Sequence, residues 1–367
     1  MNILVYYDSS NFAIYVSSVA VELSKTHSVI LLTQSSKGEI HSDVEKYGVK
    51  SYGYELQEKN SIWFYFKQLL HLIRFIKSNR IELVISHNHP CNFVSVFAQF
   101  FCKAKFIISR HHTDIVMLGN NKMAKRIDRI INRLGKKFIV PSTKTVNQMI
   151  LSEGVAKDKI VKIPYAYNFD DYPKINSQLK IELKNQYPGA LIFITIGRLI
   201  EGKRTEELII EFEKWCAAGM NIRLLILGDG PNKSHLDKLI QVKSLSSKVI
   251  LLGRQPNVLD YIYASDLVIH LSESETSCNV IKEAAICEKP VIVCEDVGDF
   301  DEYMKHHVNG FVIPKYGYEE QLFRIVTDFY SGKEKFSQLG VQLNKDVMQK
   351  FSIDKIIHQY ENILDSI

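Results

Sequence analysis

Apolar runs in the first 142 residues alternate with stretches whose apolar positions recur at helical spacing. The runs have the β-branched and aromatic content of buried strands, and they cover residues 2–7, 28–33, 82–87, 105–109 and 137–142. Helical spacing holds over residues 15–23, 64–77, 92–102 and 121–134. Apolar strands that alternate with helices predict a parallel sheet covered by helices on both faces.

A second series of the same kind begins at residue 191. Its strand-like runs each precede a helical segment, and they cover residues 191–197, 223–228, 248–253, 267–272 and 290–295. The intervening stretch 164–190 holds three of the nine prolines together with acidic and polar residues, which is typical of a domain boundary. Residues 352–367 carry apolar side chains at helical spacing, which predicts a final helix packed on the body.

These patterns predict an α/β protein with two Rossmann-like, doubly wound parallel-sheet domains, residues 1–170 and 171–350, and a C-terminal helix over 351–367. The chain length of 367 residues agrees, because single cores stop growing at roughly 250–300 residues. The composition, 46% apolar and 24% charged, excludes a disordered or fibrous chain. Ligands of such sheets bind beyond the carboxyl ends of the strands, so we expect both domains to present loops toward one cleft.

Cysteine usage and the N-terminus indicate a cytoplasmic protein. The six cysteines form no CxxC pair and no disulfide-dense framework, which is typical of a reducing compartment. The first residues, MNILVYYDSSN, lack the basic start of a signal peptide. The most apolar stretch, residues 62–76, is interrupted by charges, so we expect no transmembrane helix.

The net charge of +5 is divided unevenly, because residues 1–170 carry +10 and residues 171–367 carry −5. Seven of the cations lie in residues 122–137, interleaved with apolar residues at helical spacing. This pattern suits an amphipathic helix on an anionic membrane surface, which would place the protein peripherally on the inner face of the cell membrane. It equally suits an ordinary helix with an apolar core face and a solvated basic face. No nucleic-acid-binding module accompanies the basic residues, so no nucleic acid is expected as a partner.

Two segments of the second half carry candidate chemistry. Arg198 and Lys203 lie between a strand and a helix, where two cations and the free amides of a helix N-terminus suit a diphosphate. Glu275 and Glu283 lie eight residues apart around the opening of a later helix. Two carboxylates at that spacing also occur on solvated helix faces, so neither segment alone identifies a site.

Together the two segments resemble the C-terminal domain of GT-B-fold glycosyltransferases, specifically the large retaining family four, also called glycosyl transferases group 1. Further matches follow in the family's order, at residues 224–231, 249–272, 287–293 and 297–314. Residues 137–170 resemble the family's stretch before the interdomain linker. The resemblance implies a retaining glycosyltransferase that moves a sugar from a nucleotide-sugar to a glycan or lipid-linked acceptor, in the biosynthesis of cell-surface polysaccharide or glycoconjugate.

The resemblance also implies residue roles. Arg198, Lys203, Glu275 and His111 are the expected catalytic residues. The expected donor-binding residues are Gly197, Arg198, Lys203, Gly228, Arg254, Glu275, Ser277, Cys278, Asn279, Val280 and Glu283. In the family, the first motif Glu contacts hydroxyls of the donor sugar, the second binds the ribose, and backbone amides between them face the phosphate. A UDP-sugar is favoured over a GDP-sugar as donor, and no permanently bound cofactor is expected.

No metal is expected either, because the basic side chains and the helix N-terminus neutralise the diphosphate. The HNH at 87–89 and the HH at 111–112 lack carboxylate and cysteine companions at metal-ligand spacing.

On the acceptor side, the resemblance implicates His111, since the family often has a His at the end of this strand. His112 is the alternative if the register differs by one, and both residues also fit a plain loop cap. Relatives often carry a Gly-Gly pair in the first strand-to-helix loop, where this chain has Ser9, Ser10 and Asn11. A second departure is the turn after Glu275, which reads Thr-Ser-Cys in place of Gly-Phe-Gly.

Two other functions use the same fold. One is a nucleotide-sugar epimerase, and the other is a non-catalytic nucleotide-binding partner of another transferase. The order of the motifs favours the transferase.

Overall fold

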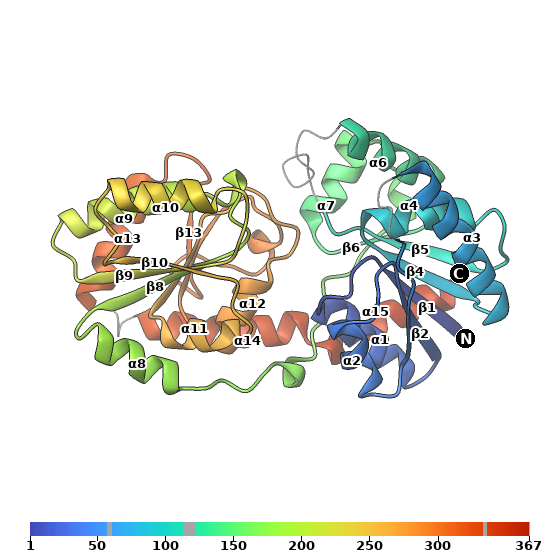
Figure 1. The fold of residues 1–367 in the computed structure, drawn as a ribbon, viewed down its shortest axis with the longest axis horizontal. Helices are drawn as coiled ribbons and strands as arrows, with labels where there is room; N and C mark the ends of the chain where they lie inside the picture. The colour runs from blue at the N-terminus through green and yellow to red at the C-terminus, as the bar shows by residue number, and fades with distance from the viewer. Residues whose placement is uncertain (57–60, 113–121, 333–335, 367) are drawn as a thin grey trace. The chain divides into compact units, whose positions relative to one another are not determined.

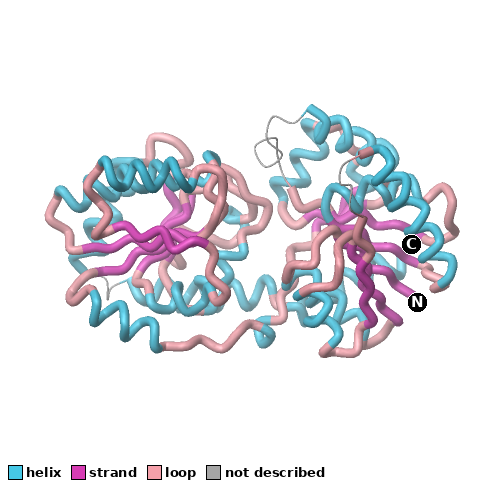
Figure 2. Tube along the Cα trace, in the orientation of Figure 1, coloured by secondary structure: helices cyan, strands magenta, loops and turns pink. Residues whose placement is uncertain are grey.

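The computed structural model describes residues 1–56, 61–112, 122–332 and 336–366. The chain divides into two compact units, Met1–Asn168 with Phe351–Ile367, and Phe169–Lys350 (Figure 1). The division falls after Asn168 and before Phe351, beside the predicted boundaries at 171 and 351. In each unit a parallel sheet carries helices on both faces (Figure 2), and the predicted α/β, doubly wound fold class is confirmed.

The first unit contains a seven-stranded parallel sheet in the order β3-β2-β1-β4-β5-β6-β7. Its strands are β1 (Asn2–Tyr7), β2 (Ser28–Thr33), β3 (Lys50–Gly53), β4 (Leu83–His87), β5 (Lys105–Ser109), β6 (Phe138–Val140) and β7 (Ile160–Lys162). Its α-helices are α1 (Ile14–Ser24), α2 (Glu39–Glu45), α3 (Ile62–Ser78), α4 (Asn88–Ala98), α6 (Lys122–Leu134), α7 (Thr143–Asn147) and α15 (Ile353–Ser366). Strand order reverses between β1 and β4, where Ile3 pairs with Leu83.

Alternate side chains of one strand serve the two faces of this sheet. Ile3 and Val5 of β1 pack with residues of α1, α2 and α15, whereas Leu4 and Tyr6 pack with residues of α3 and α4. This is the period-two pattern of a strand buried on both faces, and it explains why the strands appear in the sequence as continuous apolar runs. The C-terminal helix α15 belongs to the core of the first unit, where Ile353 and Ile356 are buried.

The second unit contains a six-stranded parallel sheet in the order β10-β9-β8-β11-β12-β13. Its strands are β8 (Leu191–Ile196), β9 (Ile222–Leu227), β10 (Val249–Gly253), β11 (Leu267–His270), β12 (Val291–Cys294) and β13 (Phe311–Ile313). Its α-helices are α8 (Gln178–Gln186), α9 (Thr205–Ala217), α10 (Lys233–Val242), α11 (Val258–Ala264), α12 (Asn279–Ile286), α13 (Glu319–Gly332) and α14 (Ser337–Phe351). Strand order reverses between β8 and β11, where Leu267 pairs with Phe193.

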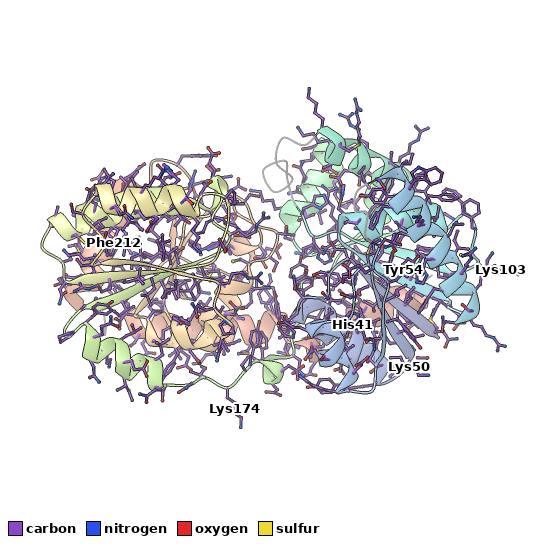
Figure 3. All side chains as sticks on the ribbon, viewed as in Figure 1. His41, Lys50, Tyr54, Lys103, Lys174 and Phe212 are labelled. Atoms are coloured by element: carbon purple, nitrogen blue, oxygen red, sulfur yellow. The ribbon has the colours of Figure 1, made fainter. Side chains whose placement is uncertain are left out.

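Aromatic rings from three elements fill the centre of the second unit. Phe193 of β8 meets Trp215 of α9 and Phe329 of α13 at centroid distances of 6.1 and 6.3 Å. Phe212, labelled in Figure 3, contacts Trp215 at 6.1 Å and is fully buried. Such edge-to-face packing gives the sheet a rigid support for the loops at its carboxyl edge.

The structure corrects several predicted elements. Strands β3, β7 and β13 were not predicted, because each has only three or four residues and no long apolar run. Helix α4 begins at Asn88, four residues before the predicted start, with Pro90 in its first turn, where proline costs no helical hydrogen bond. Among the described residues, we find no helix with the length and apolarity needed to span a bilayer.

Candidate functional site

The candidate site of the second unit lies where the strand order reverses, at the carboxyl ends of β8 and β11. Gly197 and Arg198 follow β8 directly, and the segment from Leu271 to Cys278 follows β11 and leads into α12. In open α/β sheets this is the place where ligands bind, because the loops from the two neighbouring strands diverge there. The fold therefore brings together two segments that lie more than 70 residues apart in the sequence.

A cavity of about 640 Å³ opens at the carboxyl ends of β8, β9 and β10. It is lined by Ile196, Gly197, Arg198, Leu227, Gly228, Asp229, Gly230, Arg254, Gln255 and Val258. Four of the predicted donor-binding residues, Gly197, Arg198, Gly228 and Arg254, are thus in its wall. Both arginines are exposed, so two cations are available to an anionic ligand of nucleotide size.

Gly228 forms the close approach between β8 and β9 at the base of this cavity. Its φ is 133°, and a Cβ atom at this position would lie 1.8 Å from the carbonyl oxygen of Gly197. The amide of Gly228 donates to the carbonyl of Gly253 at 2.8 Å, which ties β10 to the same point. Any side chain at position 228 would push the strands apart, and the cavity depends on glycine there.

Glu275 lies beside the cavity as an ion-paired carboxylate. Its Oε1 accepts hydrogen bonds from Lys203 Nζ and from His270 Nε2, the second at 2.7 Å. Burial alone would raise the pKa of Glu275, but the hydrogen bond from His270 and the charge of Lys203 outweigh it and lower that pKa to about 2. A void of about 10 Å³, lined by Lys203 and His270, shares Ile196, Gly197 and Leu227 with the large cavity.

His270 ends strand β11, and its surroundings favour its protonated form. Burial lowers its pKa, but the neighbouring Cys278 sulfur and the Glu275 carboxylate outweigh burial and raise the pKa to about 9. The Nε2 atom lies 3.6 Å from Cys278 Sγ. Glu275 is therefore held between an ammonium and an imidazolium at neutral pH.

The donor atoms of His270, Glu275 and Cys278 lie within 4.8 Å of one another, which is close enough for a metal ion. A metal ion bound there would have to displace the proton of His270 and the Lys203 ammonium from Glu275. We interpret the three side chains as an ion-paired cluster. The sequence did not predict this cluster, because His270 is a single polar residue within the strand-like run 267–272.

The turn after Glu275 leads directly into α12. Ser277 and Cys278 are buried in this turn, and Asn279 and Val280 are the first two residues of the helix. The first amides of a helix have no partner four residues back and carry its positive dipole end, so this turn can receive an anion. Thr276, Ser277 and Cys278 are 3%, 9% and 5% exposed, so the side chains that stand in place of Gly-Phe-Gly point into the unit.

Glu283 lies one turn further along α12 and is not in the wall of the large cavity. Burial raises the pKa of its carboxyl to about 7. Burial is the main cause of the raised pKa of the nearby Tyr172 hydroxyl, and the charge of Glu283 raises that pKa further. Among the described residues, no hydrogen-bond partner meets that hydroxyl. Within the described ranges no cation offsets the effect of burial on Glu283, in contrast to Glu275, so its carboxyl titrates near neutrality.

In the first unit, His111 is engaged through both ring nitrogens. Its Nδ1 meets Tyr165 Oη at 2.6 Å and its Nε2 meets His87 Nδ1 at 2.9 Å. Tyr165 stacks on Tyr15 at a centroid distance of 4.2 Å. Burial lowers the pKa of His87 to about 3 and, together with the charges of His87 and His112, lowers the pKa of His111 well below its usual value. His111 is therefore a neutral ring held in a chain of side chains.

His112 points instead toward α6, where its Nε2 lies 3.1 Å from Asp128 Oδ2. His89 reaches the same carboxylate at 3.2 Å. These two histidines and Asp128 join α6 to α4 and to the segment after β5. Of the HNH and HH motifs, His89 and His112 thus make this contact, and His87 and His111 pair with each other.

The predicted acceptor-side residues Ser9, Ser10 and Asn11 lie in the loop between β1 and α1. The Asn11 amide donates to Ser9 Oγ at 3.1 Å, and the Ser10 carbonyl accepts from the Ile40 amide at 3.1 Å. Asp8, just before them, accepts from Asn88 Nδ2 at 2.7 Å across the point where strand order reverses in this unit. The loop thus has no glycine and is held by polar contacts within itself, to α2 and to α4.

The basic helix α6 packs three of its apolar residues inside the unit. Ile127, Ile131 and Leu134 pack in a core cluster with Val96 and Phe138. Lys122, Arg126, Arg129 and Arg133 remain exposed. Met123 and Ile130 of the same helix are 60% and 37% exposed, so the packing shows a core face and leaves both predicted interpretations of this helix open.

Comparison with known proteins covers both units. The family model described as Glycosyltransferase Family 4 matches residues 13–170, and the model described as Glycosyl transferases group 1 matches residues 178–344. The N-acetyl-alpha-D-glucosaminyl L-malate synthase of Bacillus anthracis is 27% identical over 267 residues, which cover 71% of this chain and 68% of that protein. The phosphatidylinositol N-acetylglucosaminyltransferase gpi3 subunit of Schizosaccharomyces pombe is 28% identical over 180 residues, 48% of this chain and 38% of that protein.

The crystal structure of Anabaena HepE in complex with UDP-glucose matches all of both chains with a TM-score of 0.83 at 19% identity. At this identity the likeness establishes the fold, while the two family models establish the family. The chain therefore belongs to the group 1 glycosyltransferases and has their GT-B fold.

Proposed function

We propose that this glycosyltransferase uses a UDP-sugar, transfers the sugar with retention of configuration to a glycan or lipid-linked acceptor, and needs no bound metal. The observation that carries the proposal is Glu275, held as a carboxylate by Lys203 and His270 beside a cavity that presents Arg198 and Arg254. A fixed carboxylate suits sugar hydroxyls, and the flanking cations suit a diphosphate.

The chemistry requires stabilisation of the leaving group. The bond between the anomeric carbon and the diphosphate oxygen breaks, the bond to the acceptor oxygen forms on the same face, and the acceptor proton passes to the leaving phosphate. Negative charge grows on the diphosphate, and Arg198, Lys203 and the start of α12 stabilise it in a site that is already organised. The ammonium of Lys203 has three N–H donors, so it can hold Glu275 and still donate to phosphate.

Glu283 is assigned to the ribose. A carboxylate accepts hydrogen bonds from two vicinal hydroxyls with its two oxygens. Its pKa of about 7 means that binding competes with protonation at neutral pH, so nucleotide binding draws the carboxyl into its charged form.

UDP as the carrier is supported by HepE, which has been crystallised with UDP, with UDP and glucose, and with UDP-glucose. The names of the relatives from Bacillus anthracis and Schizosaccharomyces pombe specify N-acetylglucosaminyl groups, which supports a hexose or N-acetylhexosamine as the transferred sugar.

A lipid-linked acceptor is supported by the phosphatidylinositol in the name of the fission yeast relative and by the exposed cations of α6. Because Ile127, Ile131 and Leu134 pack in the core, attraction of α6 to anionic lipid headgroups would act mainly through its exposed cations. We propose that the protein works in the cytoplasm at the inner face of the membrane, in the synthesis of cell-surface polysaccharide or glycoconjugate.

The test is a panel of UDP- and GDP-sugars incubated with the purified chain, with release of nucleoside diphosphate and the anomeric configuration of the product as readouts. We expect turnover of a UDP-sugar, an α-linked product from an α-linked donor, and no loss of activity with EDTA. Glu275→Ala and Arg198→Ala should abolish turnover.

An isomeric nucleotide-sugar formed without acceptor would identify an epimerase instead. Tight nucleotide binding with no turnover of any donor or acceptor would identify a non-catalytic partner.

A further inference from the structure

Three side chains of the second unit form a closed, buried triangle next to the candidate site. Lys282 Nζ lies 2.7 Å from Asp299 Oδ2 and 2.9 Å from Ser277 Oγ, and Ser277 Oγ donates to Asp299 Oδ2 at 2.6 Å. Lys282 is 0% exposed and Asp299 is 1% exposed. Each of the three groups is thus bonded to the other two with almost no contact with water.

The triangle joins three segments that surround Glu275. Ser277 belongs to the turn after Glu275, Lys282 belongs to α12 directly before Glu283, and Asp299 follows β12. The neighbour of Asp299, Gly298, approaches so closely that a Cβ atom there would lie 2.9 Å from Glu275 Cβ. The φ of Gly298 is 58°, a conformation that favours glycine.

Stability alone is a weak reason for such a triangle. Taking a lysine and an aspartate out of water costs as much as their attraction returns, and a well-packed apolar pair of similar volume is often at least as stable. A buried ion pair does impose one arrangement on its surroundings, because any other arrangement leaves a charge without a partner. What this triangle specifies is the position of the turn at residues 275–278 relative to α12.

We propose that Ser277, Lys282 and Asp299 are positioning residues for the donor diphosphate. They hold the turn so that the Glu275 carboxylate and the first amides of α12 meet the sugar and the phosphates together. The side chain of Ser277 acts as the point of attachment in a turn that has no glycine. This inference rests on the proposed function, because it assumes that a nucleotide-sugar binds at the turn.

The proposal separates the phosphate part of the ligand from the nucleoside part. The triangle touches the turn and the start of α12, whereas the large cavity is lined by residues after β8, β9 and β10. Loosening the turn therefore weakens the contacts that the turn makes to the distal phosphate and the sugar. It affects less the contacts made by the cavity residues, including Arg198, and by Glu283 further along α12. A merely structural role for the triangle would weaken every ligand equally.

The decisive variant is Ser277→Ala, because it removes the attachment while leaving Lys282 and Asp299 paired. The matched control is Ser265→Ala, a serine of the same unit that is 1% exposed and donates to one backbone carbonyl, that of Ile262, at 2.7 Å. The second variant is Lys282→Met with Asp299→Asn, which removes both charges at once and leaves no lone buried charge.

Binding of UDP and of UMP is measured by calorimetry, and kcat and KM are measured with the best UDP-sugar. We expect Ser277→Ala and the double variant to weaken UDP binding about tenfold, the effect of one lost hydrogen bond to a charged group, with UMP binding changed less than about twofold. The serine control should bind both nucleotides as the wild type does.

Wild-type UDP affinity in both test variants, or an equal loss for UDP and UMP, would overturn the positioning role while leaving the proposed function intact. A wild-type chain that binds neither UDP nor any UDP-sugar would refute the proposed function and this inference together.

Discussion

Replacing Glu283 by Gln should make the unliganded protein more stable and the nucleotide complex weaker. Burial raises the pKa of this carboxyl from 4.5 to about 7, so the folded state resists its ionisation. A difference of about 2.5 pKa units corresponds to roughly 3 kcal/mol at 1.36 kcal/mol per unit, and partial exposure of the residue reduces this to about 2 kcal/mol.

The sign of the pH dependence follows from the raised pKa. Below pH 4.5 the carboxyl is neutral in both the folded and the unfolded state and costs nothing. Between pH 4.5 and 7 the unfolded state releases the proton first, so stability is lost as the pH rises through this window and stays low above it. Glutamine has no proton to lose and keeps the stability of the neutral form throughout.

The assay is thermal unfolding of the wild type and Glu283→Gln at pH 4.5 and pH 8, followed by calorimetric titration with UDP. At pH 8 we expect the variant to unfold about 4–8 °C higher, since 1 kcal/mol shifts the Tm of a unit of this size by about 2–4 °C. At pH 4.5 the two proteins should agree. The exposed Glu319→Gln is the control and should change neither quantity.

Nucleotide binding should move in the opposite direction. Loss of two hydrogen bonds to a charged acceptor weakens UDP binding at pH 8 by at least about tenfold, and wild-type affinity should rise between pH 6 and 8 while that of the variant stays flat. The reasoning fails if Glu283→Gln lowers the Tm at pH 8, because the carboxylate would then have a stabilising partner. A stabilised variant with unchanged UDP affinity would instead show that Glu283 does not bind the ribose.

Three further perturbations test separate parts of the molecule. Arg198→Ala should weaken UDP binding by about tenfold to a hundredfold, and it should not lower the Tm, because the side chain is exposed. If the likewise exposed Lys184→Ala weakened UDP binding as much, the effect would come from the net charge of the protein and not from a contact of Arg198. Tyr165→Phe removes the hydroxyl that meets His111 Nδ1, so kcat should fall while UDP affinity stays within about twofold. An unchanged kcat would show that the orientation of His111 does not affect turnover. Three exposed charges of α6 can be reversed together, as Arg126→Glu, Arg129→Glu and Arg133→Glu. This should weaken binding to vesicles with anionic phospholipid by at least about tenfold and leave binding to neutral vesicles unaltered. Equal binding of the wild type to both kinds of vesicle would contradict a charge-based contact.

The sequence predicted the sheets well because each central strand is buried on both faces and therefore apolar along its length. The runs at 2–7, 28–33 and 105–109 coincide with β1, β2 and β5. Edge strands give no such signal, since β3 has a single buried residue and β13 has only three residues. The predicted cavity residues Gly197, Arg198, Gly228 and Arg254 come together because each follows the carboxyl end of a parallel strand or lies within one residue of it.

Side-chain partners were the part that the sequence could not supply. Glu275 was expected to face sugar hydroxyls, but its two cations come from His270, inside an apolar strand, and from Lys203, 72 residues earlier. Lys282 stands beside Glu283 on a helix, where lysine is usually solvated, and only the fold shows that Asp299 receives it. In α6, apolar residues at helical spacing pointed equally to a membrane and to a core, and only the structure shows that Ile127 and Ile131 pack in the core while Met123 is exposed.

The C-terminal helix α15 makes the first unit discontinuous in sequence. Its residues Ile356, Ile363 and Leu364 complete the cluster that also contains β1 and α1, although some 180 residues of the other unit intervene (Figure 1). A gene fragment that stops at residue 168 therefore encodes an open apolar face and should aggregate on expression. A single protease cut between the units should leave both halves in one particle on gel filtration, because α15 stays docked. The second unit, by contrast, is one continuous segment, Phe169–Lys350.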